Sequence, residues 1–120
     1  MITILSNLEK RKFQFWHYKV SHGELLIRSP KSDKYPENID ILFFDVKYVE
    51  LPRFLPDLKI EEASDEDVKY VDEKLQKETK TNDIVVLLSN GNRYLVVSSI
   101  MKIVENDLDL FELPFENLKY

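Results

Sequence analysis

Short stretches of alternating apolar and polar residues, rich in aromatic and β-branched side chains, dominate the chain and predict β-strands. The first is residues 12–20, where we expect Phe13, Phe15 and His17 on one face of a strand. The other face would then hold Gln14, Trp16, Tyr18 and Val20. Gly23 allows a tight reversal at residues 21–24, and residues 24–29 read as the returning strand. These stretches predict a first β-hairpin.

A second hairpin is predicted from the turn residues Ser89-Asn90-Gly91-Asn92 between two apolar runs, residues 83–88 and 93–97. Asn-Gly supplies the two positive φ angles of a type I′ turn, which is the turn that suits a two-residue hairpin loop. Residues 100–104 either extend the second of these strands past a bend or form a short strand of their own.

The longest β-rich stretch is residues 39–51, and it follows a polar loop at residues 30–38. Its alternation changes phase near Phe43 and Phe44, which predicts a bulge or bend there because one extra residue exchanges the two faces of a strand. Pro52 and Pro56 end the stretch, since proline cannot donate to the ladder of a central strand.

One helix is predicted after Ser64, which forms a capping-box pattern with Asp67. Val68, Val71 and Leu75 then recur at helical spacing and give a narrow apolar stripe. We expect this helix, at about residues 65–78, to lie on an edge or one face of the sheet. Residues 105–120 are predicted to be a tail that packs back through its apolar members, which are Leu108, Leu110, Phe111, Leu113 and Phe115.

The predicted fold class is α+β: a strongly bent antiparallel sheet of about six strands with one helix at about residues 65–78. A chain of 120 residues suits a single domain, residues 1–120.

The composition excludes several kinds of chemistry. The chain has no cysteine, so it has no disulfide, thiolate metal site or cysteine nucleophile. Its longest apolar run, residues 84–88, is too short to cross a bilayer, and its first residues lack the features of a signal peptide. We therefore expect a cytoplasmic protein that does not bind membranes. Glycine stands only at positions 23 and 91, which excludes glycine-rich phosphate loops.

Charge is unevenly distributed along a chain whose net charge is −5. Residues 61–83 hold nine acidic residues against four lysines, and the densest group is Glu61, Glu62, Asp65, Glu66 and Asp67. Carboxylates can hold divalent cations, but the spacing and glycine of a calcium-binding loop are missing, and acidic residues are common where a helix begins. We predict no metal and no cofactor. We expect the group to bind a protein partner that has a basic surface.

A second candidate contact is the apolar loop between the two prolines, with Arg53, Phe54 and Leu55 at its centre. These residues either cap an open end of a barrel-like sheet or, if exposed, form an apolar anchor at a protein interface.

Two other classes of function remain as alternatives. Lys10, Arg11 and Lys12 precede an aromatic strand, so a nucleic-acid-binding module would use them together with Trp16 and Tyr18. The acidic net charge and the core-like alternation disfavour this function. A small enzyme would have to be built around His17 or His22, which no pattern places beside a carboxylate. We therefore predict that the protein is not an enzyme.

Residues 16–29 and 38–43, followed by Leu51-Pro52, resemble the opening of a group of small uncharacterised bacterial proteins. Some domains of this style resemble immunity proteins, which block a toxin by binding it. The resemblance implies a non-enzymatic inhibitor of a bacterial toxin, and it carries no catalytic residues.

Overall fold

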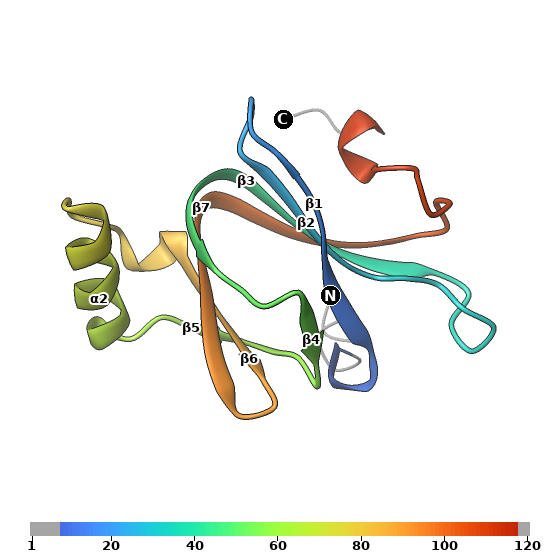
Figure 1. Ribbon diagram of the computed structural model, residues 1–120, viewed down its shortest axis with the longest axis horizontal. Helices are drawn as coiled ribbons and strands as arrows, with labels where there is room; N and C mark the ends of the chain where they lie inside the picture. Colours follow the sequence, from blue (N-terminus) through green and yellow to red (C-terminus); the bar gives the residue numbers. More distant parts are fainter. Residues whose placement is uncertain (1–7, 118–120) are drawn as a thin grey trace.

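A computed structural model describes residues 8–117 and shows one curled antiparallel sheet, one α-helix and three short 3₁₀ helices (Figure 1). The strands lie in the order β4-β1-β2-β3-β7-β6-β5. The strands are β1 (Lys12–Lys19), β2 (Glu24–Ser29), β3 (Asn38–Glu50), β4 (Phe54–Pro56), β5 (Lys59–Glu62), β6 (Ile84–Ser89) and β7 (Asn92–Asn106). The helices are η1 (Leu8–Lys10), α2 (Asp65–Leu75), η2 (Thr81–Asp83) and η3 (Pro114–Asn117).

The predicted α+β class, the bent sheet and the single α-helix are confirmed within the described residues. The two predicted hairpins, β1–β2 and β6–β7, are also confirmed. Of the two alternatives for residues 100–104, the structure shows the extension, since β7 continues to Asn106. The sheet has seven strands where about six were expected. The difference arises between the prolines and the helix, where the short β4 and β5 form the two edges of the sheet.

The curl of the sheet comes from a shared bend in its two longest strands, β3 and β7, which pair along almost their whole length (Figure 1). The register skips one residue between Val46 and Tyr48, and Asp45 has a φ of 57°. Ser99 on β7 donates a hydrogen bond to the Asp45 carboxylate at 2.6 Å, which holds the bend across both strands. A bulge or bend was expected near Phe43 and Phe44. Both remain in regular register with β7, and the bulge lies at Lys47, three to four residues further along the strand.

The bend brings the two edges of the sheet together. β4 and β5 lie at opposite ends of the strand order, yet only Asp57 and Leu58 separate them in the chain. The concave face of the sheet therefore encloses its own core. Its fully buried members include Phe13, Leu25, Ile27, Ile41, Phe43, Leu55, Leu58, Leu87 and Val96.

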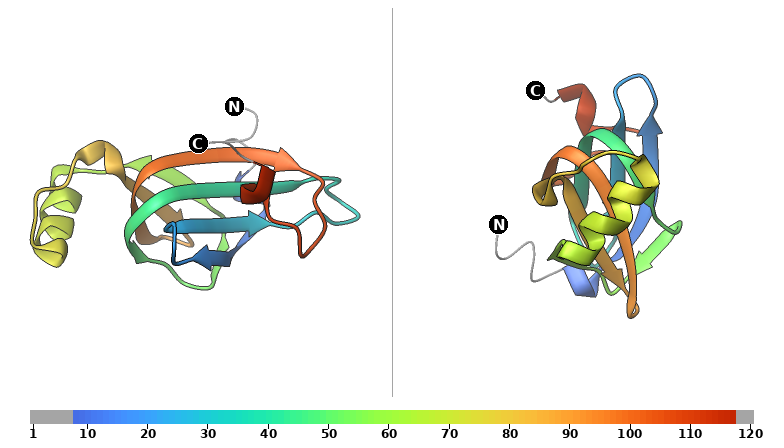
Figure 2. Two further views of the ribbon diagram at one scale, coloured as in Figure 1. Left: turned by 90° about the horizontal axis from the view of Figure 1, so that it is seen from above. Right: turned by 90° about the vertical axis from the view of Figure 1, so that its left-hand side faces the viewer.

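Two segments cover the convex face of the sheet at opposite ends of the molecule (Figure 2). α2 buries Val71 against Ile84 and Val86 of β6 and Leu95 of β7. At the other end, Phe115 of η3 packs on β2 and β3. Both strand faces are thus buried in the middle of the sheet, as apolar residues on both faces of β2 and β3 require.

The helix is three residues shorter than predicted. The chain leaves the helix at Gln76, which adopts a left-handed conformation with a φ of 57° and donates its backbone N–H to Asp72. The capping box formed by Ser64 and Asp67 is present as predicted. Within residues 8–117, no helix is long and apolar enough to cross a membrane.

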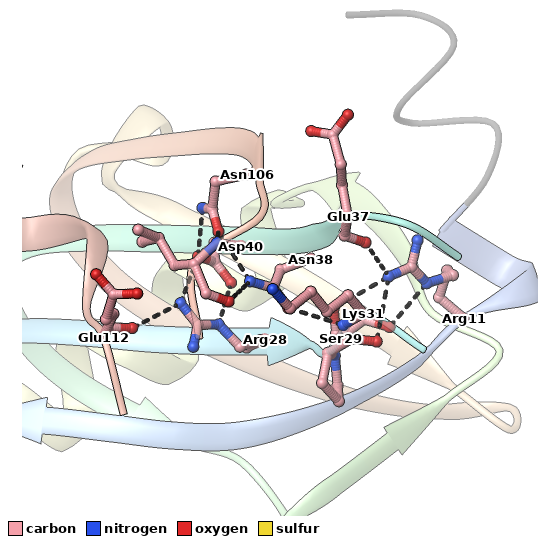
Figure 3. Close-up of polar contacts among 11 residues, drawn as sticks. Arg11, Arg28, Ser29, Lys31, Glu37, Asn38, Asp40, Asn106 and Glu112 are labelled. Carbon is pink, nitrogen blue, oxygen red and sulfur yellow. Dashed lines mark hydrogen bonds and ion pairs between the residues drawn. The ribbon is translucent and has the colours of Figure 1, made fainter. Parts of the chain in front are cut away.

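A buried ion pair lies under the C-terminal segment on the convex face (Figure 3). The Nε and Nη2 atoms of Arg28 donate to the two carboxylate oxygens of Asp40 at 2.7 and 2.9 Å, and the side chains are 1% and 0% exposed. Asn106 also donates to Asp40, and Arg28 donates to the carbonyl oxygen of Glu112. Nη1 of Arg28 is buried without a hydrogen-bond partner, but the Trp16 ring lies 5.5 Å from the guanidinium carbon and stabilises its charge.

We expect Gly23→Ala to lower the free energy of unfolding by about 2–3 kcal/mol, because a Cβ would add close contact to backbone strain. Gly23 has a φ of 57°, and its Cβ would lie 3.0 Å from the backbone nitrogen of Val46. Gly91→Ala is the matched control, since a Cβ there meets nothing within 4 Å. It should cost only about 1 kcal/mol, the cost of the positive φ alone. Urea unfolding of the two variants measures this, and equal losses would contradict it.

We expect Asp40→Asn to destabilise the protein by about 3–5 kcal/mol, because it leaves the Arg28 charge buried without its carboxylate. The double variant Arg28→Met/Asp40→Leu removes both charges and should cost less than the single substitution. Denaturant unfolding of the three proteins gives the comparison. A double variant less stable than Asp40→Asn would show that the ion pair stabilises the fold more than apolar packing does.

Candidate functional site

The predicted acidic group lies on β5 and the first turn of α2, and the structure divides it into two kinds of carboxylate. Arg93 donates to Asp67 at 2.7 Å and to Glu61 at 3.3 Å. Glu62, Asp65 and Glu66 are exposed and form no ion pair with another described side chain. We call these last three residues the free acidic surface.

Asp67 serves the fold as well as the surface. Its side chain accepts hydrogen bonds from the backbone N–H and the hydroxyl of Ser64, in addition to that from Arg93. Burial opposes ionisation, but the hydrogen bonds from Ser64 and Arg93 outweigh it and lower the pKa of Asp67 below its ordinary value. The carboxylate is therefore already occupied as a helix cap, which makes it a poor candidate for partner binding.

A carboxylate with two tyrosine partners lies beside α2. Tyr48 and Tyr70 both donate their hydroxyls to Oε2 of Glu50, at 2.6 and 2.5 Å. The hydrogen bond from Tyr48 is the main cause of a lowered pKa of Glu50, and the same bonds raise the pKa of both tyrosines. This cluster joins the end of β3 to the helix, so its role is structural.

In the loop between the prolines, successive side chains of β4 point to opposite faces of the sheet, so Phe54 and Leu55 lie in different surroundings. Leu55 is fully buried in the enclosed core, whereas Phe54 is 56% exposed, with the Arg53 guanidinium 5.1 Å from its ring. The expectation that Leu55 contacts a partner is therefore wrong, because its side chain is part of the core. Arg53 and Phe54 remain available at the surface.

A bulge in β1 changes the predicted faces of the aromatic strand. Phe15 pairs with Ile27 and His17 with Leu26, which leaves Trp16 as the extra residue. Trp16 packs on the convex side with the Phe115 cluster, and the ring of His17 lies 6.3 Å from Phe115. The prediction that His17 shares a face with Phe13 and Phe15 is therefore wrong.

The residues proposed for nucleic-acid binding do not share one surface. Tyr18 lies over the concave side with Phe15 and Val46, whereas Trp16 lies on the convex side. The side chain of Arg11 is buried against β2 and the following loop. The predicted basic and aromatic strand therefore does not present a continuous stacking platform.

A site that the sequence did not reveal is the turn at residues 109–112 in the C-terminal segment. The N–H of Glu112 donates to the carbonyl oxygen of Asp109, and the N–H of Asp109 donates to the Glu112 carboxylate, both at 3.0 Å. Phe111 at this turn is 91% exposed and Leu110 is 55% exposed. The predicted packing of the tail is therefore right for Leu113 and Phe115 and wrong for these two residues.

The 109–112 turn borders a surface groove of about 480 Å³ along β1. Its lining comes from β1, the loop before β4 and the C-terminal segment: Gln14, Phe15, Trp16, His17, Arg53, Leu110, Phe111 and Leu113. The groove thus combines exposed apolar side chains with one arginine, which is the composition of protein-binding surfaces.

The described residues show no arrangement typical of a hydrolytic or metal centre. Among the side chains that the structure describes, neither His17 nor His22 forms a hydrogen bond with a carboxylate. In the same part of the chain, no three histidine or acidic side chains lie close enough together to hold a metal ion.

The chain matches no protein-family model, no curated protein and no solved structure. The function must therefore be argued from the surfaces themselves.

We expect the two kinds of carboxylate to respond differently to mutation. Asp67→Ala should lower the free energy of unfolding by about 1 kcal/mol, because the cap and the Arg93 contact are both lost. The triple change of Glu62, Asp65 and Glu66 to Gln should leave it within about 0.5 kcal/mol of the wild type. Thermal and urea unfolding measure both, and a triple variant less stable than Asp67→Ala would assign the free acidic surface to the fold.

Proposed function

We propose that this chain is a non-enzymatic protein-binding domain whose partner offers a basic surface with an apolar pocket. The observation that carries the proposal is Phe111, which the 109–112 turn holds almost fully in water. Burying one such side chain is worth about 1.5–3 kcal/mol, so an ordered and exposed phenylalanine suits an interface anchor.

The turn is ordered before any partner binds. Arg28 holds the carbonyl oxygen of Glu112, and Asn38 holds that of Leu108 at 2.9 Å. Lys31 adds a hydrogen bond to the carbonyl oxygen of Asp107. Because the backbone around Phe111 is fixed, binding would order little additional chain, which favours affinity.

Charge around the anchor determines the kind of partner. Asp107, Asp109 and Glu112 are exposed beside Phe111, and among the described residues the ion-pair partner of Asp109 is Lys31, at 3.5 Å. A basic partner surface would be attracted to this turn, and repulsion would disfavour an acidic one. The free acidic surface on β5 and α2 would raise the encounter rate with the same partner.

An immunity-type inhibitor is the specific role we propose for this binding. It is supported by the resemblance of residues 16–29 and 38–43 to small immunity-like proteins and by an acidic surface suited to a basic toxin domain. Co-expression with the product of the neighbouring gene tests the role: rescue of growth by the wild type and loss of rescue by Phe111→Ser are expected. Equal rescue by both proteins would contradict it.

A crosslinking experiment tests the binding surface directly. A photoreactive phenylalanine in place of Phe111 should crosslink one basic protein in an extract of the source cells. The same residue at Val20, which is 82% exposed on another hairpin, is the matched control and should not capture it.

With the captured protein purified, Phe111→Ala should weaken binding about 30-fold, as expected for an anchor residue. Neutralising Glu62, Asp65 and Glu66 should mainly slow association at low salt. Equal crosslinking at positions 111 and 20, or unchanged affinity of Phe111→Ala, would refute the assignment of the 109–112 turn.

A further inference from the structure

Two arginines, Arg11 and Arg28, are buried, and among the side chains that the structure describes only Arg28 forms an ion pair (Figure 3). Arg28 is paired with Asp40. Arg11 is 6% exposed, and it forms no ion pair with a carboxylate in the described part of the chain. Glu105, which lines the same cleft, attracts this charge through space without an ion-pair contact, and burial lowers the pKa of Arg11 despite that attraction. A buried charge without a direct ion pair is costly, so its surroundings require an explanation.

Neutral oxygens hold the Arg11 guanidinium in place. Nε donates to the hydroxyl of Ser29 at 2.9 Å, and Nη2 donates to the carbonyl oxygens of Ser29 and Glu37 at 3.1 and 2.9 Å. A longer bond of 3.5 Å reaches the carbonyl oxygen of Pro30. These bonds fix the plane of the guanidinium without neutralising its charge.

One nitrogen of Arg11 remains available. Nη1 forms no hydrogen bond with a described residue, and Figure 3 shows it on the side of the guanidinium that faces away from the acceptors of Nε and Nη2. Arg11 also lines an open cleft of about 720 Å³. The N–H groups of Nη1 are therefore free to bind an acceptor that enters from solvent.

The cleft gathers further positive charge around the ring of Tyr35. Lys10 and Lys34 line it with Arg11, and both lysines are exposed. The Arg11 guanidinium lies 4.2 Å and the Lys34 ammonium 5.4 Å from the Tyr35 ring centre, and the Tyr35 hydroxyl donates to the carbonyl oxygen of Lys10. Tyr35 thus holds the three cationic residues around one opening.

Two carboxylates also line the cleft, those of Glu37 and Glu105. Neither forms a hydrogen bond with Arg11, and the Glu37 carboxylate points away from the guanidinium in Figure 3. Three cations against two carboxylates leave the opening with a net positive charge.

We propose that this cleft binds an oxyanion, a phosphate or carboxylate group of a small molecule, with Arg11 as the anchoring donor. Nε and Nη2 are held by the protein, so Nη1 offers its N–H groups from a fixed position, and a hydrogen bond from a charged guanidinium to an oxyanion is stronger than one between neutral groups. Lys10 and Lys34 supply the flanking charge. The proposal stands on the cleft alone and does not depend on the protein-binding function.

The test is a titration at low ionic strength, followed by the ¹H–¹⁵N NMR signals of the Arg11 side chain and of residues 34–37. Inorganic phosphate, adenosine monophosphate and glutarate are the probes. We expect saturable shifts with a dissociation constant of about 1 mM or lower for at least one of them. If only inorganic phosphate and adenosine monophosphate saturate the shifts, the cleft is a phosphate site. If only glutarate does, it is a carboxylate site, and if all three do, it is a general oxyanion site.

Lys34→Glu should weaken the binding about tenfold, since it places a negative charge at the mouth of the cleft. Lys69→Glu on α2 is the matched control and should leave binding unchanged, because Lys69 does not line the cleft. Arg11→Lys keeps the positive charge but removes the planar guanidinium. Binding, now followed by the signals of residues 34–37, should be weaker than in Lys34→Glu. Absence of saturable shifts with all three probes, or equal binding by the wild type and Lys34→Glu, would overturn the proposal.

Discussion

The shared bend of β3 and β7 is the constraint from which the rest of the architecture follows. An antiparallel pair of this length, if straight, would give an open sheet with two exposed faces. The bulge at Asp45–Lys47 and the hydrogen bond from Ser99 turn both strands at one point. The sheet then curls into a half-barrel, and a two-residue link is enough to join its opposite edges at β4 and β5.

The curl of the sheet buries the apolar side chains of the concave face, whereas those of the convex face must be covered by other segments. The chain uses a different device at each end: α2 contributes a narrow apolar stripe over β6 and β7, and η3 contributes Phe115 over β2 and β3. Under the C-terminal segment the cover is partly polar, since Arg28 and Asp40 form a pair there that also binds the Glu112 carbonyl. Its hydrogen bond to Glu112 links the position of the segment to the buried pair.

The same cover segments supply the functional surfaces. The 109–112 turn belongs to the C-terminal segment that covers part of the convex face. The Arg11 cleft lies at the start of β1, beside the loop that precedes β3. Both sites are irregular segments held by a rigid sheet, which is the usual placement of binding residues. Their chemistry differs: one offers an exposed aromatic ring among carboxylates, and the other a fixed guanidinium held by neutral oxygens.

Local patterns in the sequence determined the hairpins and the start of the helix. Gly23, Asn90-Gly91 and the Ser64 capping box act through their own backbone and nearest neighbours, so a window of a few residues contains the necessary information. The overall class followed for the same reason, because strand alternation and a single helical stripe are local periodicities.

The positions of the β1 bulge and the β3 bend are set by which residues face each other across strands far apart in the chain. The separation of buried Leu55 from exposed Phe54, and of packed Phe115 from exposed Phe111, has the same origin. Arg11 and Arg28 carry the same intrinsic charge, and only the folded sheet decides that Arg28 pairs with Asp40 whereas Arg11 is held by neutral oxygens of the described residues. Sequence alone thus determined the elements and the class of fold, whereas the tertiary structure decided the sites, because burial and charge pairing depend on non-local neighbours.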